Sequence, residues 1–341
     1  MMKRRLGRSN IEVCALGFGC MEIGGRMKDH ERPPVKGSTH DTDQYFFLGE
    51  VNDQESIRAI HAALDRGISL FDTAPAYGAG HSERVLGKAL SEKRQEAVIA
   101  TKFGKFIDEQ QNIFGRYPNE RVLVDNIRSE CEDSLVRLRT DYIDIYQFHQ
   151  EGDYTLLAYA DEVIDILESL VSEGKIRFYG WSTGDPACAR VFARGTHCTA
   201  IQHSLSLLKD APELLEICTT YDQGSISRGV LAMGILSGKY TRENYKTLLA
   251  PDDYRLRDSA GTRLLHNLEQ LDKIKHVLTS DGRTIPQGAL AWNWARSDRT
   301  IPIVGFRRLS QIPENSKALE YGPLNNDQMN EIDKILERKI R

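Results

Sequence analysis

Four polar residues stand at or just beyond the ends of short apolar segments, and their types fit acid–base chemistry. Asp72 ends the run ISLFD, Lys102 lies near the end of AVIATKF, and His149 ends YIDIYQFH. Tyr77 follows five positions after Asp72, in the glycine-rich stretch APAYGAG. Each residue alone is equally well explained as a helix cap, a solvated strand end or a hydrogen-bonded core group. Their recurrence at successive strand ends favours one shared site.

The four side chains would support one another chemically. A tyrosine hydroxyl has an unperturbed pKa of about 10 and is a poor proton donor at neutral pH. A lysine ammonium beside Tyr77 would lower that pKa, so that Tyr77 could act as an acid. Burial would neutralise Lys102 unless a carboxylate kept it charged, which explains why a buried strand ends on Asp72. His149 could donate a hydrogen bond to a substrate oxygen.

This donor set suits the reduction of a carbonyl group. Negative charge develops on the carbonyl oxygen as hydride reaches the carbon, and positioned donors stabilise that charge. Side chains supply no hydride, so the reaction requires a nicotinamide cofactor.

The surrounding sequence predicts the elements that would position these residues. From residue 52 onward, helical and strand-like hydrophobic patterns alternate along the chain. The predicted strands are LGFGC, ISLFDTA, AVIATKF, YIDIYQFH, IRFYGWST, AIQHSL, SISRGVL and RTIPIVGF. The predicted helices span residues 52–67, 81–90, 119–138, 160–174, 185–195, 211–222, 284–298 and 309–319.

This alternation predicts an α/β fold, a (β/α)₈ TIM barrel in which the C-terminal ends of the strands converge on one opening. A Rossmann domain is the alternative, but GAGHSE lacks the third glycine of the G-x-G-x-x-G motif. We expect residues 1–341 to form one domain.

Three segments depart from the repeat. KRRLGRSNIEVCAL predicts an N-terminal β-hairpin that turns at residues 7–10 and closes one barrel end. Residues 25–50 and 240–263 are expected to be long connections without regular structure. Both follow predicted strands, which places them on the catalytic face as functional loops.

Composition excludes several classes of function. The 45 Lys and Arg residues against 49 Asp and Glu give a net charge of −4, which argues against nucleic-acid binding. No window approaches the roughly 18 apolar residues of a membrane helix, and no signal peptide is recognised. We therefore expect a cytoplasmic protein. The six cysteines form no C-x-x-C pair, so we expect buried thiols and no metal site.

The sequence resembles the aldo-keto reductases nearly end to end. The resemblance lies in RRLGRSNIEVCALGFGCM, GISLFDTAPAYGAGHSERVLGKAL, VIATKFG, LRTDYIDIYQFH, GKIRFYGWST, GILSGKY and IPIVGFRRLSQIPEN. The family's catalytic tetrad falls on Asp72, Tyr77, Lys102 and His149. The resemblance also implies an extended NADPH or NADH bound without a Rossmann domain.

The resemblance assigns cofactor contacts to the later strands. Ser182 and Gln202 would hold the nicotinamide carboxamide. Thr183 stands where members commonly have Asn, which puts one carboxamide contact in doubt. Arg228 stands where many members stack an aromatic ring on the nicotinamide, and a planar guanidinium can stack similarly. The remaining contacts implied near the nicotinamide end are Gly19, Met21, Asp72 and Gly305.

The rest of the cofactor would lie along two loops. Backbone N–H groups of Gly229 and Leu231, with Lys239 nearby, would bind the pyrophosphate; ordinary glycine turns at a helix end are the alternative. The adenosine 2′-phosphate would meet Arg307 and Arg308, and the adenine would lie near Gln311 and Asn315. Two guanidiniums at a helix N-terminus favour a phosphate dianion, so NADP(H) is preferred and NAD(H) is possible.

Three functions fit these residues. The first is an NADP-dependent carbonyl reductase or alcohol dehydrogenase acting on a small aldehyde, ketone or sugar. The polar residues of segment 25–50 favour a hydroxylated substrate, unless that loop is simply solvated. The second is a redox-neutral sugar lyase or epimerase with tightly held cofactor, and the third is a cofactor-sensing regulatory subunit. The oligomeric state stays open.

Overall fold

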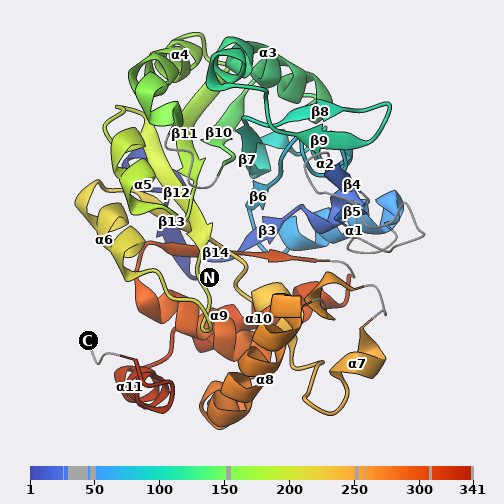
Figure 1. The fold of residues 1–341 in the computed structure, drawn as a ribbon, viewed down its shortest axis with the longest axis vertical. Helices are drawn as coiled ribbons and strands as arrows, with labels where there is room; N and C mark the ends of the chain where they lie inside the picture. The colour runs from blue at the N-terminus through green and yellow to red at the C-terminus, as the bar shows by residue number, and fades with distance from the viewer. Residues whose placement is uncertain are drawn as a thin grey trace.

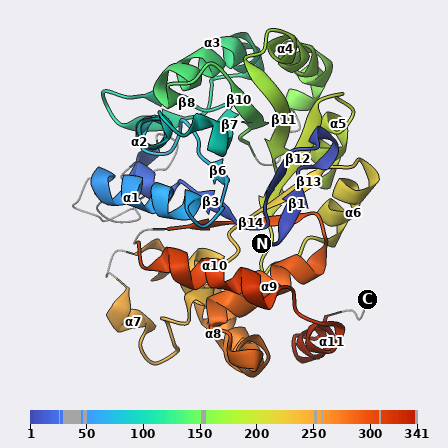
Figure 2. The same cartoon turned by 180° about the vertical axis from the view of Figure 1, so that it is seen from behind.

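The centre of the molecule is a closed barrel of eight parallel strands with helices around its outside (Figures 1 and 2). The computed structural model describes residues 1–25, 27–29, 45–46, 51–150, 155–249, 253–256, 258–306 and 309–338. Around the barrel the strands are β3 (Gly17–Gly19), β6 (Leu70–Asp72), β7 (Val98–Phe103), β10 (Ile143–Phe148), β11 (Ile176–Ser182), β12 (Cys198–Ser204), β13 (Gly224–Arg228) and β14 (Thr300–Gly305). Each overlaps a predicted strand, with β12 starting two residues and β13 one residue earlier than predicted, so the predicted (β/α)₈ barrel is confirmed.

The eight helices predicted between and after these strands are all present. They are α1 (Asp53–Leu64), α2 (His81–Leu90), α3 (Glu120–Leu138), α4 (Ala160–Ser172), α5 (Pro186–Phe192), α6 (Pro212–Thr220), α9 (Ile285–Arg296) and α10 (Gln311–Tyr321). Several begin at a capping side chain: Asn52 accepts from the backbone of α1, and Asn119 accepts from that of α3. Capping side chains therefore stand at the starts of helices that the hydrophobic pattern predicts.

The expectation that residues 240–263 lack regular structure is wrong. The segment contains α7 (Tyr245–Leu248) and the start of a long helix, α8 (Asp258–Leu278). Leucines at 264, 268 and 271 are buried on α8, against α11 (Asn326–Ile335), which the sequence pattern also missed. The three-to-four-residue spacing of these leucines was the available signal.

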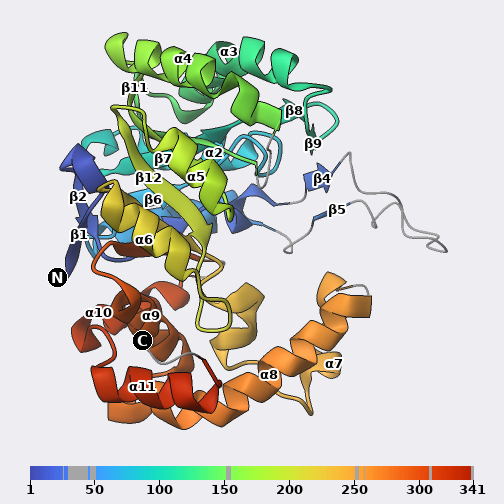
Figure 3. The same cartoon turned by 60° about the vertical axis from the view of Figure 1, so that its left-hand side comes forward.

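A second sheet lies at the C-terminal end of the barrel. Its four strands run in the order β5 (Tyr45–Phe46), β4 (Met27–Asp29), β9 (Ile113–Gly115) and β8 (Phe106–Asp108). Figure 3 shows β4 and β5 on the opposite side of the barrel from the N-terminal hairpin. Segment 25–50 therefore includes two short strands; its other residues beyond position 25 lie outside the described residues.

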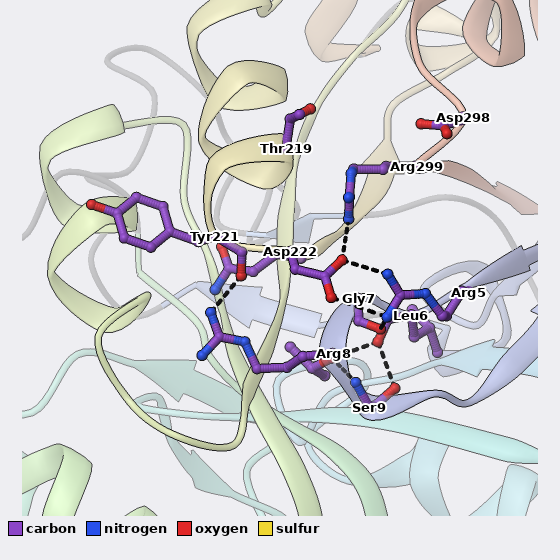
Figure 4. Close-up of polar contacts among 12 residues, drawn as sticks. Arg5, Leu6, Gly7, Arg8, Ser9, Thr219, Tyr221, Asp222, Asp298 and Arg299 are labelled. Atoms are coloured by element: carbon purple, nitrogen blue, oxygen red, sulfur yellow. Dashed lines mark hydrogen bonds and ion pairs between the residues drawn. The ribbon is translucent and has the colours of Figure 1, made fainter.

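The predicted N-terminal hairpin is confirmed as β1 (Lys3–Arg5) paired antiparallel with β2 (Glu12–Cys14). Arg5 donates to both carboxylate oxygens of Asp222 at 3.0 and 2.6 Å, and Arg299 donates to the same carboxylate at 2.6 Å (Figure 4). Gly7 has φ +51°, and a Cβ there would lie 2.4 Å from the Asp222 carbonyl oxygen, so the turn requires glycine. The hairpin is thus held against the base of β13.

Side chains alternate along the barrel strands, as a period of two requires. One inward-facing layer is apolar and packs with the hairpin residue Leu6; it comprises Leu70, Ala100, Ile145, Ala200, Ile226 and Ile301. Two positions further along five of these strands come polar residues: Asp72, Lys102, Gln147, Gln202 and Arg228. Apolar side chains therefore fill the barrel at the N-terminal ends of its strands, and the polar groups lie at the rim formed by the C-terminal ends of the strands.

Candidate active site

A buried ion pair forms the centre of the polar rim. Lys102 is fully buried, and its Nζ donates to Asp72 Oδ1 at 2.7 Å and to the Thr73 carbonyl at 2.8 Å. The same ammonium lies 3.2 Å from the hydroxyl oxygen of Tyr77. The structure therefore brings together three of the four residues selected from strand ends.

The second oxygen of Asp72 is held by two amides. Gln202 Nε2 donates to Asp72 Oδ2 at 2.6 Å, and Gln147 Nε2 lies 3.3 Å from the same oxygen. Ser182 Oγ donates to Gln202 Oε1 at 3.2 Å, which extends the network to β11. Sequence reasoning missed Gln147, although its position two residues after inward-facing Ile145 was a usable signal.

Two glycines place Tyr77 beside this pair. Gly78 has φ +65°, and a Cβ there would lie 1.9 Å from the Gly24 carbonyl oxygen. A Cβ on Gly24 would in turn lie 2.7 Å from the Tyr77 carbonyl carbon. Because the two backbones touch, the loop after β6 is fixed against the turn that follows β3.

His149 completes the tetrad from β10. Its backbone N–H donates to the Phe103 carbonyl at 2.8 Å, which fixes it relative to the end of β7. Its ring meets that of Tyr77 edge to face, with centroids 5.9 Å apart. Among the described residues, its buried Nδ1 has no hydrogen-bond partner. The ring therefore keeps hydrogen-bonding capacity beside the Tyr77 hydroxyl.

The protonation states follow from burial and the neighbouring charges. Burial favours the neutral amine of Lys102, but Asp72 and Tyr77 outweigh it and raise the pKa of Lys102, so the ammonium stays charged. Burial, together with the charges of Lys102, Lys105 and Arg228, holds the pKa of His149 well below its usual range. The imidazole is therefore neutral at pH 7.

The expected lowering of the Tyr77 pKa is wrong for this structure. Burial raises the pKa of Tyr77 and Asp72 adds to the rise, whereas Lys102 and Arg228 act in the predicted direction without outweighing them. Tyr77 is therefore protonated at neutral pH.

The proposed nicotinamide contacts lie on the same rim. Ser182, Thr183 and Gln202 are buried at the ends of β11 and β12, and Arg228, which ends β13, is close enough to act on the pKa of Tyr77. The Thr183 hydroxyl accepts from the Asp185 backbone N–H at 3.0 Å, at the start of α5. That hydrogen bond gives Thr183 a structural role that the sequence did not indicate.

The other implied cofactor residues occupy several neighbouring turns. Gly305 pairs with Gly19 at the ends of β14 and β3, and Met21 precedes a short 3₁₀ turn. Gly229 has φ +67° directly after β13, and Leu231 lies two positions further on. Lys239 is exposed, and its ammonium lies over the Tyr240 ring. Helix α10 begins at Gln311, and its residue Asn315 is buried. Arg307 and Arg308 lie outside the described residues.

The described ranges contain no group of three or more His, Cys, Asp or Glu residues that could hold a metal ion. No helix in them is long and apolar enough to cross a membrane. The six cysteines are buried and unpaired with one another, as the sequence predicted.

A closed parallel barrel whose strand ends carry an acid–base cluster is the architecture of (β/α)₈-barrel enzymes. The sequence model of the Aldo/keto reductase family matches residues 33–337, and the chain belongs to that family of oxidoreductases. The aldo-keto reductase YhdN of Bacillus subtilis (strain 168) is 31% identical over 341 residues, covering 97% of this chain and 92% of that protein.

Other relatives carry more specific names. The NADH-specific methylglyoxal reductase of Escherichia coli (strain K12) is 30% identical over 351 residues, covering 99% of this chain and 100% of that protein. The structure of a glycerol dehydrogenase from Gluconobacter oxydans superposes with a TM-score of 0.77 at 28% identity, covering 99% of this chain and 96% of the other.

Proposed function

We propose that this protein interconverts a carbonyl compound and an alcohol with a nicotinamide cofactor, NADP(H) in preference to NAD(H), and that Tyr77 transfers the proton. The observation that carries the proposal is the Tyr77 hydroxyl, 3.2 Å from the ammonium of Lys102, which is itself 2.7 Å from Asp72. The substrate class is a small aldehyde, ketone or sugar.

The residues of the rim fit a bound nicotinamide cofactor. Gln202 uses one N–H for Asp72 and accepts one hydrogen bond from Ser182, so its amide keeps a second N–H and a second lone pair. Apart from Gly229 itself and its two chain neighbours, no described residue has a heavy atom within 4 Å of the position that a Cβ on Gly229 would take, so the backbone there is open to a phosphate. Ser182, Gln202, Arg228 and Gly229 would hold the cofactor, which when bound supplies or accepts the hydride.

The chain's own residues would manage the proton. Tyr77 keeps its proton in the resting site because burial raises its pKa. Negative charge developing on a substrate oxygen would draw that proton, and the Lys102 ammonium would stabilise the phenolate left behind. Asp72 would keep Lys102 charged throughout. Neutral His149 would donate one ring N–H to the same oxygen and orient it.

The first test is a titration of the purified protein with NADPH and NADH, followed by quenching of protein fluorescence. The untreated sample is first checked for bound cofactor by its absorbance. We expect reversible binding with at least a tenfold preference for NADPH, and a larger loss for NADPH than for NADH in an Arg307→Ala, Arg308→Ala variant. Equal losses would contradict the 2′-phosphate contact, and a preference for NADH would contradict the proposed NADP(H) preference and resemble the NADH-specific relative from Escherichia coli. Cofactor that is already bound and does not exchange would favour a redox-neutral reaction or a regulatory subunit.

The second test is Tyr77→Phe. Loss of a general acid typically costs about 10²- to 10⁴-fold in rate, so we expect turnover of an aldehyde panel to fall at least 100-fold while the NADPH dissociation constant stays within twofold. Tyr142→Phe is a matched control, because the Tyr142 hydroxyl makes only an exposed contact of 3.4 Å with Gln95. An active Tyr77→Phe enzyme would exclude Tyr77 as the acid.

A further inference from the structure

A buried carboxyl group outside the tetrad holds the chain where it leaves β7. Glu130 lies on α3 and is only 9% exposed. The backbone N–H of Gly104 donates to its two carboxyl oxygens, with N···O distances of 3.0 and 3.2 Å. The Tyr117 hydroxyl lies close enough to the same carboxyl to lower the pKa of Glu130 as a hydrogen-bond partner. Two donors from different parts of the chain thus meet at Glu130.

Those two donors stand at the two ends of one hairpin. Gly104 directly follows β7, Tyr117 comes two residues after β9, and the β8–β9 hairpin lies between them. The rings of Phe106 and Tyr117 also meet edge to face, with centroids 6.2 Å apart. The carboxyl group therefore ties the entry and the exit of the hairpin to α3.

The backbone at Gly104 leaves the barrel by a path that only glycine allows. Its φ is +98°, and a Cβ there would lie 2.5 Å from the ring of Phe148. Because the chain turns away at this point, its N–H donates to the Glu130 side chain instead of a neighbouring strand. A carboxyl group, even when protonated, has acceptor capacity on both oxygens, whereas the amide of a glutamine has a single acceptor oxygen.

The hairpin in turn carries the rest of the second sheet. β9 pairs with β4, Lys28 opposite Ile113 and Asp29 opposite Phe114, and β4 pairs with β5. β3 and β7 are the neighbours of β6, the strand that ends on Asp72. The loops that follow β3 and β7 therefore join one another on the face of the barrel that holds Tyr77.

Gly104, which donates to this carboxyl group, lies close to the tetrad along the chain. Gly104 follows Lys102 by two residues, and the intervening Phe103 accepts the backbone N–H of His149. A shift at Gly104 would therefore reach both the hairpin and the end of β10.

Burying a carboxyl group is costly. Burial raises the pKa of Glu130 to about 8, against the lowering effects of the Gly104 N–H, Tyr117 and Arg137, while Glu83 adds to the rise. The hydrogen-bond partners of Glu130 offset part of that cost.

We propose that Glu130 is a positioning residue that fixes the β8–β9 hairpin, and with it the four-stranded sheet, as the substrate-binding side of the site. It acts through Gly104 and Tyr117 and touches neither cofactor nor substrate. This inference rests on the proposed carbonyl chemistry. The proposal assigns two binding affinities to different parts of the structure. The four-stranded sheet governs the affinity for the carbonyl compound, and the ends of β11 to β13 govern the affinity for the cofactor.

The kinetic test compares Glu130→Gln and Tyr117→Phe with the wild-type enzyme at saturating NADPH. We expect KM for the best aldehyde of the panel to rise about tenfold in Glu130→Gln and less in Tyr117→Phe, with kcat and the NADPH dissociation constant within twofold. Glu132→Gln is the matched control: it lies on the same helix, and its exposed carboxylate pairs with Lys175 at 2.7 Å. An unchanged KM in Glu130→Gln, or a parallel loss of NADPH affinity, would overturn the proposal.

A second readout does not depend on turnover. Hydrogen–deuterium exchange of the backbone amides in residues 104–117 should speed up at least threefold in Glu130→Gln, and to a smaller extent in Tyr117→Phe, with the barrel strands β11 to β13 unchanged. If the wild-type protein reduces no carbonyl compound, the proposed function fails and the exchange experiment still decides the role of Glu130. Exchange rates equal to those of the wild type across residues 104–117 in a folded Glu130→Gln protein would refute the positioning role of Glu130. If that variant does not fold, wild-type exchange rates in Tyr117→Phe would refute it.

Discussion

Lys102 is charged in a place where an isolated lysine would lose its proton. Asp72 compensates for the missing water, and the two amides on the other oxygen of Asp72 keep that carboxylate in place. A buried pair of this kind contributes little net stability, but removal of one partner leaves an uncompensated charge. Under the proposed mechanism, the pair would therefore serve both catalysis and folding.

Lys102→Met should test both roles. We expect the free energy of unfolding to fall by about 3 kcal/mol, because Asp72 loses its counter-charge in the barrel interior. Turnover should be lost as well. Urea denaturation gives the stability, and Lys88→Met, an exposed substitution on α2, is the control. An unchanged unfolding midpoint would show that the amides of Gln147 and Gln202 suffice to hold Asp72.

The sequence was enough to select four residues that the structure brings together, because polar groups at or just beyond the ends of apolar strands are conspicuous. It did not reveal Gln147, since a neutral amide within a strand resembles any other polar residue. The direction of the Tyr77 pKa also could not be read from it. That direction depends on how completely Tyr77 is buried, and the loop that carries it packs against Gly24, more than 50 positions earlier in the chain.

The turn after β3 and the loop after β6 hold Tyr77 by direct backbone contact. Gly78→Ala would place a methyl group 1.9 Å from the Gly24 carbonyl oxygen, so one of the two loops must move. A displacement of about 1 Å in a catalytic group can cost about 100-fold in rate, and we expect kcat to fall by that order.

Gly174→Ala separates this displacement from simple backbone strain. Gly174 has φ +74°, similar to that of Gly78, but no described heavy atom lies within 4 Å of its Cβ position. Its alanine variant should lose about 1 kcal/mol of stability and keep full turnover. If both variants kept their kcat, the contact between the glycines would not position Tyr77.

The repeated elements could be predicted because their signals are local. Hydrophobic periods indicate the barrel strands and the eight predicted helices, and these were found. β4, β5, β8 and β9 were not, because each has only two or three residues and is defined by its partner. β4 and β9 come together from positions 28 and 113, a pairing that no local pattern contains.

The two ends of the barrel carry different side chains: one end is apolar and the other is the polar rim. Leu6 from the hairpin is fully buried among apolar barrel residues such as Leu70 and Ile226, at the end away from the polar rim. Stability at this end and chemistry at the other should therefore respond to different substitutions.

Leu6→Ala should lower the free energy of unfolding by about 3 kcal/mol, since it leaves a cavity at the barrel base. NADPH affinity and kcat should stay within twofold. Lys3→Ala is the control, because its ion pair with Glu12 is exposed and contributes little. A loss of cofactor affinity in Leu6→Ala would mean that the two ends are coupled.

The pairing of β4 with β9 also constrains how this enzyme can diversify or be redesigned. The insertions after the first and third barrel strands are joined by a single strand pairing, so their edges must match in length and register. A chimaera that receives one insertion from a relative would keep that insertion's own hairpin but would lose the matched β4–β9 edge. Transfer of both insertions, together with the α3 segment that carries Glu130, would keep the four-stranded sheet intact.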